Sequence, residues 1–337
     1  MGFPGLGHRG YIQFGREATY GTAVAATHRI PFVSCETRPV GGTIDSEMMN
    51  NARWLHGIYQ GPKHYETTLV VELWYEGMLL LLDGLMGTGT YGANGGTTSG
   101  GSPFAHTITQ QDLLNSYTFQ IIEGRIPATT CQRLLGAKID RAEISGSKGS
   151  GNDAILRLTL TLLSRSYQTA QAITGSLNAV TALPILFHEM QGVSAFLDGT
   201  ADVAADKVLQ NFTVSINNNL ARRHHSTAAT ILEPIAEGFC EVEIRLTKEF
   251  QTVALLDAFN AFTAAVPTEP TLVFGVTSSK RFTISTPGTA VIPTYGHPIS
   301  GPGIIMQDVT WKGFRANPGG AGPLQLLVEN TQATIVT

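Results

Sequence analysis

The chain has 337 residues, of which 42% are hydrophobic and only 14% are charged, and its formal net charge is −4. This length allows two ordinary domains or one large β domain with a core of its own. Apart from short pairs such as Arg222-Arg223 the cations are scattered, which excludes tight binding of nucleic acid, because that needs several cations to displace counterions from phosphates. With 37 glycines and few charges, much of the surface must be neutral, as in proteins that contact other subunits.

Cysteine usage and hydropathy indicate a protein without a membrane partner. Cys35, Cys131 and Cys240 lie far apart and form no C-x-x-C pair, so we expect free thiols in a reducing compartment. The N-terminus has no apolar segment of the signal-peptide kind, and the longest apolar run, 78–82, is too short to cross a bilayer. We expect a soluble protein made in a cytoplasm.

The first distinctive stretch in chain order is EATYGTA, residues 17–23, which precedes an apolar segment at 30–32. No general base, metal ligand or phosphate loop accompanies Glu17 or Tyr20 in the sequence, so a reactive role is not supported. Gly21 allows a tight turn, and Tyr20 can anchor the segment by packing. We expect an ordered lead-in to the first strand, held by contacts within the chain or with a neighbouring subunit.

Alternating apolar and polar residues predict strands in the first half of the chain. In 65–75, Leu69 and Val71 share one face, and in 154–163 four leucines do the same. This period of two is typical of antiparallel strands with one buried and one solvated face. A further strand is expected at 117–122.

A short helix and a loop separate these strands. Residues 76–86 have apolar side chains at helical spacing and end at Gly87, a residue typical of helix termini. Residues 87–103 are rich in Gly, Ser and Thr, which predicts a loop. Gly84 inside the helical pattern weakens the helix prediction.

The second half repeats the order of the first. The pattern predicts a helix at 251–262 and strands at 211–217, 240–247, 271–276, 304–311 and 324–329. Strand 65–75 with its helix resembles strand 239–248 with its helix, and Asp83 aligns with Asp257 if a one-residue insertion lies between strand and helix. We therefore expect two modules, 1–168 and 208–337, joined by a linker or hairpin at 169–207.

No constellation of catalytic or metal-binding residues is found in the sequence. It has no G-x-S-x-G motif and no phosphate loop between a strand and a helix, and His224-His225 has no further ligands at metal-site spacing. Glu241 and Glu243 share a strand face at a separation that glycosidase acids also have, but any solvated strand face has this spacing. We predict a protein that is not an enzyme and has no cofactor or metal.

The polar face of the predicted strands suits the wall of a channel. Threonine, glutamate and isolated arginine residues line it, among them Glu241, Glu243 and Arg157. Phosphate is repelled or stays hydrated beside such a mildly acidic, hydroxylated surface. DNA would slide past it, so these three residues are candidates for lining a channel.

Several short motifs resemble those of the tail tube (major tail) proteins of long-tailed bacteriophages. GREATYGTAVAA, starting at Gly15, leads into an apolar segment, as an E-x-T-Y-G-T segment leads into the first strand of that family. Further segments similar to the family are LLLLDGLMGT at 79–88, SYTFQIIEG at 116–124, LLGAKIDRAEIS at 134–145 and NFTVSINNNL at 211–220. The resemblance covers most of the chain, and its motifs contain no catalytic residue.

The resemblance implies a mainly β fold with two tandem tail-tube-like β-sandwich or barrel modules, each with a short flanking helix, in a ring-shaped oligomer. Rings of that family typically contain six single modules whose sheets join into one inner barrel, which removes exposed strand edges. Three chains of two modules give the same pseudo-sixfold ring, which we favour over a ring of six chains. Loops at about 40–64 and 219–238 would reach the adjacent ring, with 87–103 and the N-terminal segment as further candidates.

The implied function is that of a structural subunit of a phage tail tube, located in the virion tail and assembled in the cytoplasm of the bacterial host. Its partners would be other copies of the chain and the tape measure, terminator and tail tip proteins, and DNA would pass through the tube without tight binding. The candidate inter-subunit contacts are Glu17, Tyr20, Arg53, Trp54, Arg222, Arg223 and His224.

Two alternatives remain open at this point. One is another phage tail-tip, connector or capsid-decoration protein, which would form a single ring without stacking. The other is a glycan-binding or glycan-hydrolysing β protein, which an aromatic platform or a strongly coupled acid pair would support. The three tryptophans are dispersed along the sequence, which does not favour such a platform.

Overall fold

The computed structural model describes residues 7–48, 54, 57–87, 104–124, 130–149, 151, 154–175, 177, 183–194, 209–224, 229–250, 253–261, 270–277, 280–287, 289–299, 301–315 and 322–332. It is mainly β, as predicted. The strands are β1 (Tyr11–Arg16), β2 (His28–Ile30), β3 (Ser34–Asp45), β4 (Ile58–Glu72), β5 (Phe104–Thr109), β6 (Tyr117–Ile122), β7 (Thr130–Ser147), β8 (Arg157–Ser164), β9 (Ser166–Ala172), β10 (Met190–Ser194), β11 (Leu209–Asn217), β12 (Glu241–Glu249), β13 (Thr271–Thr277), β14 (Lys280–Ser285), β15 (Thr289–Gly296), β16 (Met306–Phe314) and β17 (Gln325–Asn330). The helices are α1 (Leu79–Met86) and α2 (Ala254–Ala261), with short 3-10 turns at Gly7–Arg9 and Phe187–Glu189.

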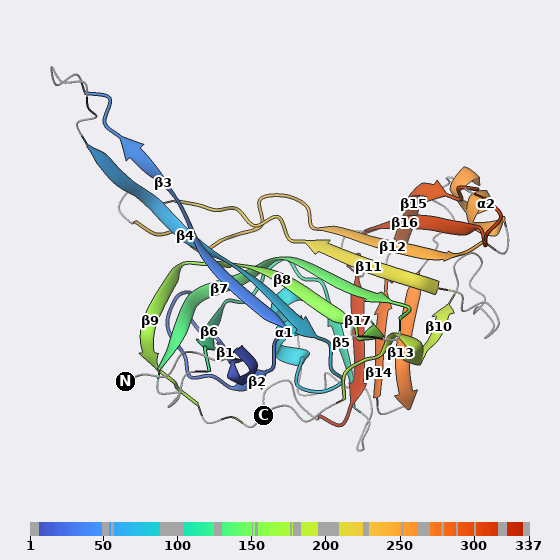
Figure 1. Ribbon diagram of the computed structural model, residues 1–337, viewed down its shortest axis with the longest axis horizontal. Coiled ribbons are helices and arrows are strands. Elements are labelled where there is room, and N and C mark those ends of the chain that lie inside the picture. The colour runs from blue at the N-terminus through green and yellow to red at the C-terminus, as the bar shows by residue number, and fades with distance from the viewer. Residues whose placement is uncertain are drawn as a thin grey trace.

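The largest feature is a run of eight antiparallel strands, which we call the long sheet. Its order is β3-β4-β8-β7-β11-β12-β16-β15, and it crosses the upper part of the molecule in Figure 1. Residues on its inner face are paired in a row and fully buried, namely Val71, Leu158, Ile144, Val214, Ile244 and Trp311. The alternation seen in the sequence therefore directs one face of this sheet into the core.

Two smaller sheets lie below the long sheet (Figure 1). The first has the order β2-β1-β6-β7-β9 and shares β7, whose N-terminal part pairs with β6 and β9 while its C-terminal part belongs to the long sheet. The second has the order β10-β13-β14-β17-β5. Among the described residues no sheet closes on itself, so the fold is an open β-sandwich with one continuous hydrophobic core.

Both predicted helices are present and shorter than expected. Helix α1 packs against β7, and α2 packs against β15. The first ends at Gly87, whose positive φ of 91° explains the choice of glycine. Gly84 is required by close packing, because a Cβ atom there would stand 2.7 Å from Cε2 of Tyr117.

The stretch between the two predicted modules is not only a linker. Residues 169–207 include most of β9, which pairs with β7, and all of β10, which pairs with β13. Residues 195–207 of this predicted linker or hairpin lie outside the described residues, as does the predicted loop 87–103 except for Gly87.

The two halves of the chain are also interlocked. β5, from the first half, pairs with β17, from the second. The carbonyl oxygen of Gln332 lies 2.7 Å from Nε2 of His106, and its side-chain Oε1 accepts a hydrogen bond of 2.8 Å from the N–H of Gly77. The C-terminal strand therefore completes a sheet that begins in the first half.

β3 and β4 extend beyond the body of the molecule as a two-stranded arm (Figure 1). Its paired residues continue to Asp45 and Ile58. The arm exposes large apolar side chains on both strands, which are Ile44, Ile58 and Tyr59, and Trp54 between the strands is 78% exposed. Such an exposed apolar surface is typical of a contact with another molecule.

Candidate channel surface and subunit contacts

The outer face of the long sheet carries polar and charged residues in regular rows. One row contains Glu72, Arg157, Ser145, Thr213, Arg245 and Thr310, each the cross-strand partner of the next. The next row contains Thr159, Glu143, Ser215, Glu243 and Lys312, and a third contains Thr161, Arg141, Asn217 and Glu241. The three residues predicted to line a channel, Glu241, Glu243 and Arg157, thus share one face.

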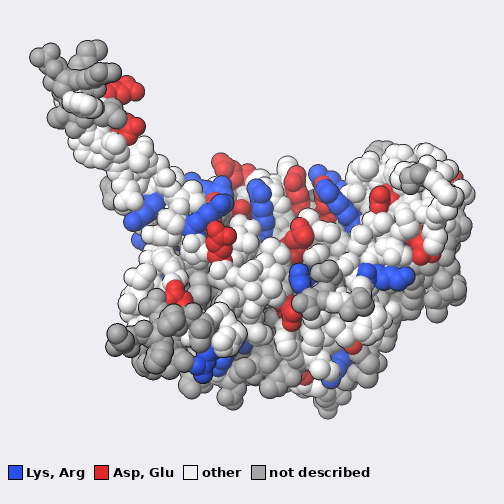
Figure 2. All heavy atoms as spheres, in the orientation of Figure 1, with Lys and Arg blue, Asp and Glu red and all other residues white. Residues whose placement is uncertain are grey.

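Charges of opposite sign alternate on this outer face. Arg245 donates a hydrogen bond of 2.9 Å to Oε2 of Glu243, and Nζ of Lys312 lies 3.7 Å from Oε1 of Glu241. In the view of Figure 2, Lys and Arg side chains stand between Asp and Glu side chains along the part formed by the long sheet. Exposed pairs of this kind contribute little to stability, so their main effect is to balance the charge of the surface.

A shallow hollow of about 460 Å³ lies in the middle of this face, between the strands of the two halves. Hydroxyl, amide, carboxylate and guanidinium groups line it, from residues such as Thr159, Ser215, Asn217, Glu243 and Arg141. Glu241 is exposed and Glu243 is partly exposed, and each lies beside a cation. This is a hydrated polar surface rather than a closed pocket around an acid pair.

A second polar cluster joins β4 to the segment after β11. Glu66 accepts hydrogen bonds from Arg38 at 3.0 Å and from Arg222 at 2.7 Å, and its Oε1 lies 3.5 Å from Nε2 of His64. The His224 ring lies 6.2 Å from that of His64. Arg222 and His224, which were predicted to contact another subunit, therefore contact the first half of their own chain.

The charges of this cluster shift two pKa values. Burial lowers the pKa of His64, and the nearby Glu66 carboxylate offsets this only in part. Burial acts to raise the pKa of Glu66, but the hydrogen bond from Arg38 and the charge of Arg222 outweigh it and hold that pKa below its ordinary value. The cluster is therefore built around an ionised Glu66 and a neutral His64 at neutral pH.

Glu17 is the centre of a buried hydrogen-bond network. Its Oε1 accepts from the Thr118 hydroxyl at 2.8 Å and from the Gly136 N–H at 2.9 Å. Its Oε2 accepts from the Ser116 hydroxyl at 2.9 Å and from the Gly21 N–H at 2.7 Å. Glu17 is 6% exposed. These four hydrogen bonds all lie within the chain, and a contact with a neighbouring subunit stays a prediction.

Tyr20 packs beside this network and anchors residues 17–27. These residues connect β1 to β2, so the predicted lead-in to the first strand is wrong, because β1 already precedes them. A Cβ atom at Gly136, which has a positive φ of 63°, would stand 2.8 Å from the Tyr20 ring. The phenol O–H donates a long hydrogen bond of 3.4 Å to the carbonyl of Leu232. Burial raises the pKa of Tyr20 well above its ordinary value, and Gly21 has the positive φ that the predicted turn requires.

The remaining predicted contact residues are placed as follows. Arg53 lies outside the described residues, and Trp54 is exposed at the end of the arm. Arg223 is exposed on the segment that follows β11. That segment runs alongside β4, where the Lys63 N–H donates to the Ala229 carbonyl at 3.0 Å.

Some residues of these surfaces were not identified from the sequence. Arg141, Glu143 and Lys312 belong to the outer face, and His64 and Glu66 form the second cluster. Arg141 and Glu143 alternate with the buried Ala142 and Ile144. This period of two in 138–145 is the sequence signal that places both charged residues on the outer face. The cluster joins residues that are distant in sequence, and no local pattern marks it.

In the part of the chain that the structure describes, no three His, Cys, Asp or Glu side chains are grouped to hold a metal ion. No helix within the described residues has the length and apolar character needed to span a membrane. A model of the family described as phage tail tube protein matches residues 7–313. A search of curated proteins finds no match.

Proposed function

We propose that this chain, which belongs to the phage tail tube protein family, lines the channel of the tube with the outer face of its long sheet. The observation that carries the proposal is this face itself, eight strands wide, solvated and balanced in charge. A structural subunit needs no reactive centre, and the face has hydroxyl groups and ion pairs where an enzyme would have a closed pocket.

The balance of charges suits passage of DNA. The carboxylates Glu241 and Glu243 repel phosphate, while neighbouring Arg245 and Lys312 are already engaged by those carboxylates. A wall of free cations would instead bind DNA by releasing counterions. The tube would thus let DNA move through without tight binding.

Two tandem modules and a ring of three chains are supported by the connectivity of the long sheet. β3, β4, β8 and β7 are connected and ordered in the same way as β11, β12, β16 and β15. A helix follows the second strand of each set. Two modules, 1–168 and 208–337, then supply eight strands per chain, and three chains close a pseudo-sixfold ring. Six chains per ring is the alternative.

Two segments are suited to contacts between stacked rings. The arm of β3 and β4 exposes Ile44, Trp54 and Tyr59, and the segment between β11 and β12 exposes Ile235 and Phe239, the latter 93% exposed. Large apolar side chains at the ends of extended segments favour burial against another subunit. We assign both segments to contacts between stacked rings. The tape measure, terminator and tail tip proteins would bind to these same segments or elsewhere on the ring.

Negative-stain microscopy of the purified protein at high concentration tests this function. We expect rings and stacked tubes, with class averages of the rings showing threefold symmetry with a sixfold appearance. Monomers alone at all concentrations would contradict the proposal. Rings that never stack would instead indicate a connector or tail-tip protein.

A further inference from the structure

Between β11 and β12 the chain makes a hairpin-like excursion, residues 220–236, which we call the strap. Its two legs are paired, since the Ala221 N–H donates to the Ile235 carbonyl at 2.8 Å and the Leu232 N–H donates to the Arg223 carbonyl at 2.8 Å. The strap comes from the second half of the chain and crosses β4 of the first half near the base of the arm (Figure 1). It is therefore a piece of one half that is fastened to the other.

Among the described residues, few backbone contacts fasten the strap to the first half. The Lys63 N–H of β4 donates to the Ala229 carbonyl at 3.0 Å, and the same lysine pairs with Thr230 in an isolated parallel bridge. On the return leg, the Pro234 carbonyl accepts a hydrogen bond of 3.2 Å from Nζ of Lys138. β3, β4 and β8, by contrast, are joined to one another by long ladders. The strap can therefore open locally without breaking a sheet.

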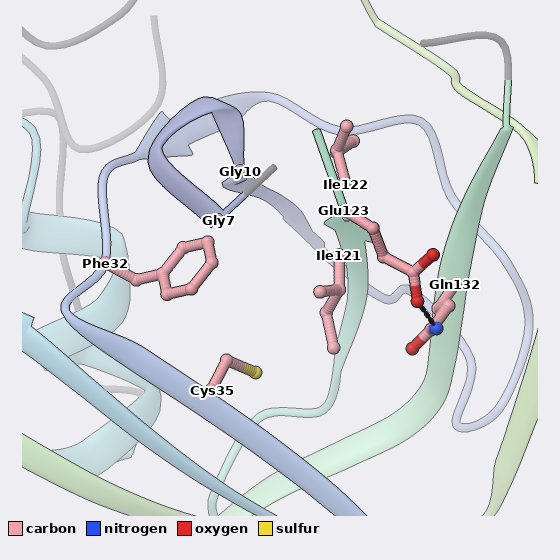
Figure 3. Close-up of a pocket in the computed structure, with 8 residues that line it drawn as sticks. All are labelled: Gly7, Gly10, Phe32, Cys35, Ile121, Ile122, Glu123 and Gln132. Atoms are coloured by element: carbon pink, nitrogen blue, oxygen red, sulfur yellow. Dashed lines mark hydrogen bonds between the residues drawn. The ribbon is translucent and has the colours of Figure 1, made fainter. Parts of the chain in front are cut away.

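The strap does not close the hydrophobic core. Leu220 and Ile231 of the strap are buried, but neither belongs to the continuous core. Access to the core lies elsewhere, at a hollow of about 410 Å³ beside β3 that no described residue of the strap lines. Figure 3 shows Phe32 and Cys35 facing Ile121 of β6 across this hollow. Lifting the strap would therefore leave the core intact.

His64 of β4 faces the strap and is 5% exposed. Neither of its ring nitrogens makes a hydrogen bond to a residue that the structure describes, and Nε2 lies 3.5 Å from Oε1 of Glu66. That oxygen already accepts a hydrogen bond of 2.7 Å from Arg222 of the strap, and Oε2 accepts one of 3.0 Å from Arg38 of β3. The ring of His224, also on the strap, lies 6.2 Å from the His64 ring between centroids.

A proton on His64 is poorly accommodated at this place. The imidazolium would be a buried third cation around one carboxylate, which Arg38 and Arg222 already share. A proton on His224 would add a further cation that faces it across 6.2 Å. Burial and like charges both disfavour a charged imidazole, and the pKa of His64 is accordingly lowered from its ordinary value of 6.5, chiefly by burial.

We propose that the strap is an acid-sensitive latch, closed over a neutral His64 at neutral pH and released from β4 when His64 takes up a proton. Once released, the imidazolium is hydrated, and Arg222 leaves Glu66 together with the strap. The return leg stays anchored to β7, because Nζ of Lys138 lies 2.8 Å from Oε1 of Glu233 and this pair is balanced in charge. Opening is a local change within one chain, so the latch does not depend on assembly.

The direction and size of the effect follow from proton linkage. The open strap lets His64 bind its proton near the ordinary value of 6.5, whereas the closed strap lowers that pKa. The closed state is therefore favoured above 6.5 and loses its advantage as the pH falls below it. Because one proton separates the two states, the ratio of open to closed straps rises by at most about tenfold for each pH unit.

Hydrogen–deuterium exchange of the unassembled full-length chain tests the latch. Labelling is compared at about pH 7.5 and about pH 5.5, with times scaled to the slower chemical exchange in acid. In acid, we expect peptides of the strap and peptides that contain Lys63 to lose protection severalfold, and by no more than about tenfold. Peptides of β8 should keep their protection, because the sheet stays closed.

Three variants assign the effect to named residues. His64→Gln has no ring to protonate, so its strap should be as protected in acid as at neutral pH. The matched control His188→Gln replaces an exposed histidine on the 3-10 turn Phe187–Glu189 and should behave like the unmodified chain. His224→Gln changes an exposed position, so it folds even where the buried substitution does not. It should lose less protection in acid, because one cation fewer faces His64.

The latch is overturned if the strap of the unmodified chain keeps its protection in acid, or if His64→Gln or His224→Gln loses as much as the unmodified chain. An equal loss across β8 would also overturn it, because the whole fold and not the strap would then open.

A second readout rests on the proposed function, which assigns the strap to contacts between stacked rings. Tubes of the unmodified chain should separate into rings at about pH 5.5, and tubes of His64→Gln should persist, which supports the latch. Tubes that form at neutral pH, together with a strap that acid does not release, would overturn the latch and leave the tube function standing. An acid-released strap in a chain that forms no tubes would support the latch and overturn the tube function.

Discussion

The Oε1 atom of Glu17 accepts a hydrogen bond of 2.9 Å from the backbone N–H of Gly136, although the two residues are separated by most of the first half of the chain. This contact fixes the connection between β1 and β2 against the point where β7 passes from one sheet to the other. Tyr20 covers the same glycine. The EATYGTA stretch is thus a structural element whose carboxylate organises backbone and hydroxyl donors.

Glu17→Gln should destabilise the subunit. Each carboxylate oxygen accepts from one hydroxyl and one backbone N–H, so either orientation of the glutamine amide turns its NH₂ towards a backbone donor that cannot rotate away. A buried group left without its partner costs about 1–3 kcal/mol. Chemical denaturation of the unassembled subunit measures the loss, and the exposed Glu237→Gln serves as the matched control. Equal stabilities of the two variants would show that the network is not needed.

Gly84→Ala should also destabilise the subunit, even though alanine is the better helix former by about 1 kcal/mol. The added methyl group would meet the ring of Tyr117, which is buried and whose O–H donates to Asp83 at 2.8 Å. Overpacking of this kind costs about 1–3 kcal/mol. Thermal unfolding compared with Gly303→Ala, where the added atom meets nothing within 4 Å, tests it. A higher melting temperature for Gly84→Ala would contradict the close packing of α1.

The contact between β4 and the segment after β11 should weaken in mild acid. Since the folded state lowers the pKa of His64, the unfolded chain binds the proton first as the pH falls through the ordinary value of 6.5. The stability present above that value is then lost progressively until the lowered pKa is passed.

His64→Gln should remove this dependence, whereas the exposed His188→Gln should not. The depressed pKa of Glu66 acts in a separate window, because its contribution is lost only below its ordinary value of 4.5. Denaturation curves at a series of pH values distinguish the two. An unchanged pH profile in His64→Gln would rule out the histidine as the source.

Reversing charge on the outer face should convert the channel wall into a DNA-binding surface. In Glu241→Lys with Glu243→Lys, the partners Lys312 and Arg245 lose their carboxylates, and up to four cations stand together on β12 and β16. Tubes should still form. Double-stranded DNA should then co-sediment with them in low salt and be released steeply as salt rises.

Asp112→Lys with Asp257→Lys makes the same change of charge at exposed positions, between β5 and β6 and on α2, that are not part of the outer face. Tubes of this control should retain less DNA than tubes of the β12 variant. Equal retention would mean that DNA binds only to the outside of the tube. The face of the long sheet that carries Glu241 and Glu243 would then not line the channel.

Shortening the arm should separate ring formation from stacking. Replacing 45–60 by a short turn removes Trp54, Ile58 and Tyr59 but leaves the β3–β4 pairs from Ser34 to Gly41 in place. We expect a circular dichroism spectrum of the native β type and isolated rings in micrographs. Global unfolding, or tubes of normal length, would refute the assignment of the arm to inter-ring contacts.

The sequence predicted those elements whose pattern is local. Tyr117–Ile122 was predicted with its observed bounds, and the alternation of leucines placed β8 to within three residues at its start. Both helices were recognised because their apolar spacing and Gly87 are local signals. Strand β15 was not recognised, since Pro293 interrupts it and a proline is typical of edge strands or loops.

The rest depends on contacts between distant segments. β7 is longer than the stretch of alternating residues within it. Leu134–Ile139 is buried throughout, because the strand passes there from one sheet to the other, and this interrupts the alternation. Nothing near His106 or Ile108 shows that β5 pairs with β17. For the candidate site, the face of Glu241, Glu243 and Arg157 followed from the period of two, but the ion pair of Arg222 with Glu66 joins the two halves and has no local trace.

The pairing of β5 with β17 has a consequence for the order of events during synthesis. Phe104–Thr109 must wait for Gln325–Asn330, more than two hundred residues later, before its edge is covered. Until then the sheet below the long sheet is incomplete, and closing so long a loop is slow. A nascent chain therefore cannot present a finished subunit to a growing tube, so premature polymerisation of incomplete chains is disfavoured by the topology itself.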